Sequence, residues 1–100
     1  MSALDIQPDG SGRFLLRGEL SFNTVSGAWQ AGQELFQGHA KVALDLGGVT
    51  RADSAGLALL VAWRREGQQQ GWSLTLEKVP EQLLAIARIS GLLDVLGLAG

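Results

Sequence analysis

Apolar and polar residues alternate near the start of the chain with the period of a half-buried β-strand. The alternation runs over 4–7, and a second strand-like pattern covers 13–20. The segment between them, 8–12, reads Pro-Asp-Gly-Ser-Gly and favours a turn. Proline fixes one backbone dihedral there, and glycine supplies the positive ones. We therefore expect the first two strands to form an antiparallel hairpin.

After this hairpin, the apolar period changes to that of an amphipathic helix. The recurring apolar positions are Val25, Ala28, Trp29, Gly32, Leu35 and Phe36. Asn23 or Thr24 can cap this helix, because either side-chain oxygen can accept a hydrogen bond from an unpaired backbone N–H. The pattern predicts that the helix ends near Gly38.

The rest of the chain repeats the change between strand and helix. The expected elements are a strand over 42–46 closed by Gly47-Gly48, a helix over about 54–69, a strand over 72–76 and a helix from about Pro80 to Gly91. Residues 92–98 are expected to pack back as a short strand or a final turn. The order β-β-α-β-α-β-α, with a possible short fifth strand, predicts a single α/β domain over 1–100. Strands that alternate with helices imply a mixed sheet with helices packed on it.

The composition is that of a globular domain. Of 100 residues, 46% are hydrophobic and 18% are charged, with a net charge of -2 and no cysteine. The acidic balance and the scattered Lys and Arg residues argue against nucleic-acid binding. The apolar run over 55–63 is far shorter than the roughly 20 residues that span a bilayer, and the N-terminus lacks a signal peptide. We expect a cytoplasmic protein with no membrane span of its own.

Residues that could carry catalysis are scarce. His39, the one histidine, lies in a Gln-Gly-His-Ala turn and is expected to be solvated. No glycine-rich phosphate loop and no metal-ligand spacing is present, so we expect no catalytic residue, cofactor or metal. Asp45 and Asp53 can in principle lie together, although Asp45 is more simply a strand-end or exposed residue. The sequence does not favour an enzyme.

The most informative segment is 50–61. Ser54 follows the strand and a short loop, and its hydroxyl can cap the next helix by accepting an N–H bond from Gly56 or Leu57. A helix N-terminus carries a partial positive charge and tolerates an anion, including a phosphate on Ser54. Ser54 is therefore either a simple N-cap or a candidate phosphoacceptor on a docking surface.

The helix after Ser54 has two apolar stripes. One stripe consists of Leu57, Leu60 and Val61; the opposite one consists of Ala55, Leu59 and Ala62, with Trp63 at its margin. A helix on a sheet buries one stripe, so the second meets either a neighbouring helix or a partner protein. Trp29 and Trp72 are expected to be core residues.

Residues 44–57, and above all the Asp-Ser-x-Gly-Leu run over 53–57, resemble the central motif of STAS domains. This fold is shared by anti-sigma factor antagonists and sulphate-transporter tails. The resemblance implies a STAS-like mixed sheet with helices packed on one side. In antagonist members the matching serine, here Ser54, is phosphorylated by an anti-sigma factor kinase.

Residues 51–60, 79–84 and 89–92 resemble MlaB-like STAS subunits of bacterial phospholipid ABC transporters. Arg51 favours this branch, because antagonists tend to be apolar just before the Asp-Ser pair. The sequence ends at Gly100, where typical antagonists continue into a last helix. The resemblance implies an accessory subunit that binds the cytoplasmic ATPase, next to the permease, of a complex that maintains outer-membrane lipid asymmetry.

A partner is expected to contact the start of the Ser54 helix and the neighbouring loop, since both follow strand ends where this fold class places its sites. The predicted partner-binding residues are Phe22, Asn23, Thr24, Arg51, Asp53, Ser54, Ala55, Gly56 and Leu59. The alternative function is an anti-sigma factor antagonist switched by phosphorylation of Ser54. In either case this chain is held at a membrane only through its partner.

Overall fold

The computed structural model describes residues 3–98 and confirms the predicted element order. Its strands and helices are β1 (Leu4–Pro8), β2 (Arg13–Leu20), α1 (Val25–Leu35), β3 (Lys41–Ala52), α2 (Ser54–Gln70), β4 (Ser73–Glu77) and α3 (Glu81–Ile89). The turn cluster before β2 behaves as expected, with positive φ angles at Gly10 and Gly12. Residues 92–98 form turns, so the alternative of a short fifth strand is wrong within the described residues.

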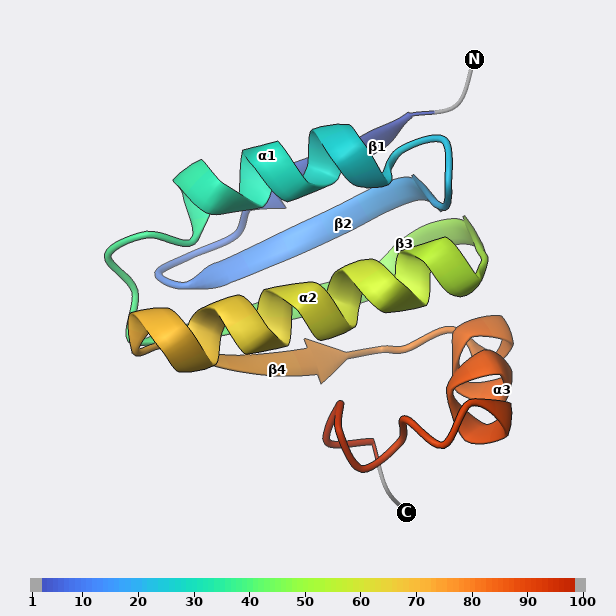
Figure 1. The fold of residues 1–100 in the computed structure, drawn as a ribbon. Coiled ribbons are helices and arrows are strands. Elements are labelled where there is room, and N and C mark those ends of the chain that lie inside the picture. Colours follow the sequence, from blue (N-terminus) through green and yellow to red (C-terminus); the bar gives the residue numbers. More distant parts are fainter. Residues whose placement is uncertain (1–2, 99–100) are drawn as a thin grey trace.

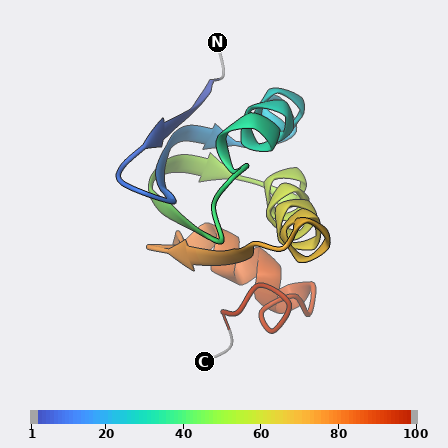
Figure 2. The same ribbon diagram turned by 90° about the vertical axis from the view of Figure 1, so that its left-hand side faces the viewer.

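The strands form one four-stranded sheet in the order β1-β2-β3-β4. β1 pairs with β2 antiparallel, whereas the β2–β3 and β3–β4 pairs are parallel, which confirms the mixed sheet. Helices α1 and α2 lie side by side on one face of the sheet, and α3 lies beyond the β4 edge (Figures 1 and 2). Helix α1 follows the carboxyl end of β2, and α2 follows the carboxyl end of β3.

Strand β3 is longer than the sequence pattern suggested. The prediction that Gly47-Gly48 closes it is wrong, because the strand continues through both glycines to Ala52. Gly48 pairs with Arg17 next to an irregularity in the register with β2. A Cβ at Gly48 would lie 2.8 Å from the carbonyl oxygen of Leu16, so glycine permits a close approach of the two strands here. No loop of several residues therefore precedes α2, and Asp53 alone separates it from β3.

The core lies between the sheet and the two helices that cover it. Leucines at alternate positions of β2 and β3 point into it and are fully buried. Phe36 contacts the rings of Phe14, Trp63 and Trp72 edge-on, at centroid distances of 5.1, 5.2 and 5.5 Å. Trp63, expected at the margin of a helix face, is 1% exposed and belongs to this core.

Three expectations about helix α1 need correction. The helix ends at Leu35, three residues before Gly38. Thr24 occupies its N-cap position, but no side chain caps the helix. Trp29, expected in the core, is only half-buried, since it lies on the side of α1 that faces α2 near the surface.

Among the described residues, no helix is both long and apolar enough to cross a bilayer.

Candidate functional site

The start of α2 is organised by Asp53, which takes the capping role that the sequence pattern gave to Ser54. Asp53 Oδ1 accepts a hydrogen bond from the backbone N–H of Gly56 at 3.0 Å. Its Oδ2 accepts from the backbone N–H of Phe22 at 3.1 Å. The prediction of a Ser54 cap is therefore wrong, and the exposed Ser54 side chain is not needed to hold the helix.

Asp53 is also held in its charged form. Its partial burial raises the pKa, but hydrogen bonds from the backbone N–H groups of Phe22, Gly56 and Ala55 lower it, as does the charge of Arg51. The lowering effects prevail, and the pKa of Asp53 lies below its ordinary value. A carboxylate is thus fixed beside Ser54 at neutral pH.

Gly56 lets α2 sit close to the end of β2. A Cβ at this position would lie 2.2 Å from the carbonyl oxygen of Leu20. Real side chains do not tolerate such a contact with backbone, so only glycine fits without a shift of the helix. The glycine of the Asp-Ser-x-Gly-Leu motif therefore has a packing reason, independent of any partner.

The loop between β2 and α1 is stiffened by short polar contacts. The Thr24 hydroxyl donates to the carbonyl oxygen of Glu19 at 2.7 Å and accepts from the N–H of Ser21 at 3.1 Å. The Ser21 hydroxyl donates to the Glu19 carboxylate at 2.6 Å. This loop places the Phe22 side chain outward, where it is 78% exposed. The loop thus presents a large apolar side chain to solvent on a backbone that is fixed by hydrogen bonds.

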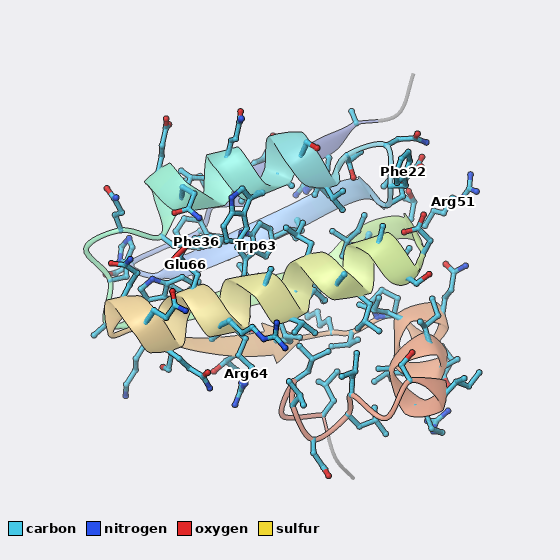
Figure 3. All side chains as sticks on the ribbon, in the orientation of Figure 1. Phe22, Phe36, Arg51, Trp63, Arg64 and Glu66 are labelled. Carbon is cyan, nitrogen blue, oxygen red and sulfur yellow. The ribbon has the colours of Figure 1, made fainter. Side chains whose placement is uncertain are left out.

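The predicted partner-binding residues divide into two groups. The exposed ones gather at the carboxyl ends of β2 and β3, and we call Phe22, Asn23, Arg51 and Ser54 the Ser54 patch. Figure 3 shows Phe22 and Arg51 at this end of the molecule. Asp53 and Ala55 are half-buried beside the patch. Thr24, Gly56 and Leu59 are buried. These three residues therefore support the exposed surface from beneath.

The second apolar stripe of α2 faces α1, but the two helices do not close over it. Leu59 is 6% exposed between them. Above it lies an open groove of about 400 Å³, which we call the interhelix groove. Its lining consists of Val25, Ser26, Trp29, Ala55, Ala58, Leu59 and Ala62. Because Ala55 follows Ser54, the groove begins at the Ser54 patch.

Asp45 and His39, the other polar residues singled out in the sequence, make contacts within the fold. Asp45 is mid-strand and mostly covered, not at a strand end, and it accepts an N–H bond from Gly47 at 2.8 Å and pairs with Lys78 at 3.5 Å. His39 is half-buried and meets the Phe14 ring edge-on. Within residues 3–98, no group of His, Asp or Glu side chains is placed to hold a metal ion. A second hollow, around Trp63, had no signal in the sequence because its lining comes from separate segments.

Comparisons with known proteins agree with this architecture. The sequence model of the family described as "Mlab, STAS domain" matches residues 5–98. No curated protein matches the sequence.

Solved structures share the fold at low identity. A sulfate transporter family protein from Wolinella succinogenes has a TM-score of 0.70 and 19% identity over 93% of this chain and 76% of its own. The unphosphorylated anti-sigma factor antagonist SpoIIAA has a TM-score of 0.65 and 17% identity over 86% of this chain and 82% of its own. Murine Slc26a9, an anion transporter, has a TM-score of 0.69 and 16% identity over 87% of this chain, which spans 15% of the transporter's length. The match over 5–98, together with the fold, shows that the chain belongs to the Mlab STAS-domain family.

Proposed function

We propose that this chain is a non-enzymatic accessory subunit that binds the cytoplasmic ATPase of a phospholipid-transporting ABC complex and supports its assembly or activity. STAS domains are generally regulatory or interaction domains, and the Mlab family match favours the transporter branch. The observation that carries the proposal is the exposed Phe22, fixed by Asp53 beside Ser54.

The Ser54 patch and the interhelix groove together suit a protein partner. Phe22 offers an apolar anchor, Arg51 a cation and Ser54 a small hydroxyl at the rim. The groove continues this surface with alanine side chains at Ala55, Ala58 and Ala62, which let a partner approach the α2 backbone closely. Contact residues of this kind, an aromatic anchor beside a small-residue groove, concentrate binding energy in a few positions.

The fixed charge of Asp53 makes this surface sensitive to a new anion at Ser54. A phosphate or a glutamate there adds negative charge beside an existing carboxylate, with Arg51 as the nearby cation. The fold does not depend on the Ser54 hydroxyl, since Asp53 caps α2. We therefore expect such a change to weaken partner binding while the domain stays folded.

A pull-down from native lysate with tagged protein tests the proposal. The transporter ATPase with its permease is expected on the wild type and on Ser11→Glu, and depleted on Ser54→Glu. Ser11 is an exposed turn residue that precedes β2, at the opposite end of the sheet, and it controls for added charge. Absence of any ABC ATPase from the wild-type sample would reject the transporter function.

The alternative is an anti-sigma factor antagonist regulated by phosphorylation of Ser54. It is favoured by the fold shared with SpoIIAA and by the exposure of Ser54 at the start of α2. In the same pull-down, this function predicts recovery of a serine kinase-like anti-sigma factor in place of the ATPase. Mass spectrometry of the chain from native cells would then show a phosphate on Ser54.

A further inference from the structure

The carboxyl end of β3 is where α3 meets the Ser54 patch. β4 pairs with β3 only over Lys41–Asp45, while β3 continues to Ala52. Within the described residues, the last part of β3 therefore has no strand beside it on the side away from β2. Figure 1 shows α3 near the end of the molecule where α2 begins. Backbone N–H groups along such an edge need another hydrogen-bond acceptor.

Gln82, in the first turn of α3, supplies an acceptor there. Its side-chain oxygen Oε1 accepts a hydrogen bond from the backbone N–H of Ala52 at 3.1 Å. The next backbone N–H, that of Asp53, donates to the carbonyl oxygen of Leu20 at 3.3 Å. The chain just before Ser54 is thus held by α3 through one N–H group and by β2 through the next.

The amide of Gln82 keeps two N–H donors for a partner. A glutamine side chain offers an acceptor oxygen and an NH₂ group, and within residues 3–98 only the oxygen of Gln82 forms a hydrogen bond. Gln82 is exposed, while the adjacent Leu83 is fully buried and anchors α3. The bond to Ala52 restricts the orientation of the amide, so its donors are pre-organised before a partner binds.

Arg51 provides a charged donor next to this amide. It directly precedes Ala52, whose N–H Gln82 holds, and it is exposed. Within residues 3–98 its guanidinium forms neither an ion pair nor a hydrogen bond, and both oxygens of the nearby Asp53 already accept backbone N–H groups. A guanidinium and a neutral amide N–H at one place are suited to binding a carboxylate.

We propose that Arg51 and Gln82 together bind a carboxylate of the partner ATPase, and that Gln82 also positions the end of β3 for this contact. The inference rests on the function proposed above. It adds α3 to the docking surface and assigns the partner an Asp or Glu side chain at this point. A negative charge at Ser54 weakens binding because it repels the same carboxylate.

Calorimetric titration of the ATPase with Gln82 variants tests the contact. Gln82→Glu keeps an oxygen acceptor for Ala52 but has no N–H donor, whereas Gln82→Met removes both. We expect each variant to weaken binding by roughly tenfold. Gln69→Glu and Gln69→Met, at an exposed position near the C-terminal end of α2, are the matched controls and should bind as the wild type does. Wild-type affinity in Gln82→Glu overturns the contact.

Hydrogen exchange of the Ala52 amide, followed by ¹H–¹⁵N NMR in the free chain, tests the positioning role without the ATPase. Exchange should be similar in the wild type and in Gln82→Glu, and at least roughly tenfold faster in Gln82→Met. Dispersed spectra of all three proteins show that they are folded. Equal exchange in Gln82→Met and the wild type overturns the positioning role.

A double-mutant cycle identifies the carboxylate. Surface Asp and Glu residues of the ATPase are replaced one at a time by Asn or Gln and titrated against the wild type and Arg51→Gln. One replacement should weaken wild-type binding by roughly tenfold and have no further effect on Arg51→Gln. If no position is coupled in this way, the carboxylate contact is overturned. A wild-type chain that binds no ATPase rejects the proposed function as well, whereas binding without these losses rejects this inference alone.

Discussion

The carboxylate of Asp53 joins the backbone of Phe22 to the first turn of α2. Its Oδ2 accepts the N–H of Phe22 at 3.1 Å, while its Oδ1 accepts the N–H of Gly56 at 3.0 Å. The side chain thereby fixes the distance between two parts of the chain that the proposed partner contacts together. The Asp-Ser-x-Gly-Leu motif thus contains both a structural pair, Asp53 and Gly56, and an exposed serine between them.

Loss of the Asp53 carboxylate is expected to destabilise the domain. Asp53→Ala removes both hydrogen bonds and should lower the free energy of unfolding by about 1–2 kcal/mol. Asp53→Asn retains one acceptor oxygen and should lower it by less. Urea denaturation followed by circular dichroism measures both values. An unchanged midpoint for Asp53→Ala would show that the cap contributes nothing.

Gly56 and Gly27 form a matched pair of helical glycines. Gly56→Ala places a Cβ 2.2 Å from the Leu20 carbonyl oxygen and should destabilise the fold by about 2–3 kcal/mol. A Cβ at Gly27 meets nothing within 4 Å, so Gly27→Ala should stabilise by about 0.5–1 kcal/mol through helix propensity. Thermal unfolding of the two variants measures these changes in stability. Equal changes at both positions would contradict the close approach of α2 to β2.

Stability is expected to fall in acid. The Gly47 N–H and Lys78 lower the pKa of Asp45, and the Arg13 guanidinium lowers the pKa of Glu77, against the opposing effect of burial in each case. The pKa of Asp53 is lowered as well. Each carboxyl binds fewer protons in the folded than in the unfolded state. Its contribution is therefore complete above the unfolded pKa of about 4 and is lost as the pH falls through the folded pKa.

Urea midpoints measured from neutral pH down to strongly acid pH check this dependence. We expect the midpoint to fall once the pH drops below the ordinary carboxyl range. The slope should be shallower in Asp53→Asn, which removes one of the titrating groups. A midpoint that rises on acidification would contradict the direction of all three pKa changes.

The sequence pattern predicted the order of elements because each has a clear apolar period and a glycine or proline boundary. It misplaced the end of β3, since a Gly-Gly pair is typical of a turn when only local preference is considered. In the fold, Gly48 is needed inside the strand for the close contact with Leu16. Asp53 and Ser54 are both good capping residues, so local preference does not decide between them. In the fold, the Asp53 carboxylate accepts the backbone N–H of Phe22, and Asp53 occupies the N-cap position.

The surroundings of Trp63 were beyond the sequence pattern. Its burial depends on the approach of α1, where Gly32 leaves space for the indole ring. The approach also turns the second apolar stripe of α2 into a groove, so the two readings of that stripe, a neighbouring helix or a partner, are not exclusive. Helical periodicity shows which face is apolar but not how far a neighbouring helix covers it.

The interhelix groove is expected to contribute to partner binding. Ala58 is exposed within it, and Ala58→Glu adds a charge and bulk without disturbing the core. We expect this variant to weaken ATPase binding by roughly tenfold. Gln68→Glu adds the same charge at an exposed position of α2 outside the groove and serves as the control. Equal affinities for the two variants by calorimetry would exclude the groove from the interface.

Phe22 is the expected anchor of the same interface. Phe22→Ala should weaken ATPase binding by about 1–2 kcal/mol while leaving the unfolding midpoint unchanged, because the side chain is 78% exposed. Ile89→Ala, at an 88% exposed position of α3, is the matched control. Surface plasmon resonance with immobilised ATPase compares them. A larger loss for Ile89→Ala would move the interface to α3.

The most direct test of the account is the affinity of this chain for the purified ATPase of the phospholipid ABC transporter from the same organism. Isothermal titration calorimetry should give a dissociation constant of about 1 μM or tighter for the wild type. The same titration should give a similar value for Ser11→Glu and a value at least roughly tenfold weaker for Ser54→Glu. No detectable heat with the wild type, or equal affinity for Ser54→Glu and Ser11→Glu, would contradict binding through the Ser54 patch.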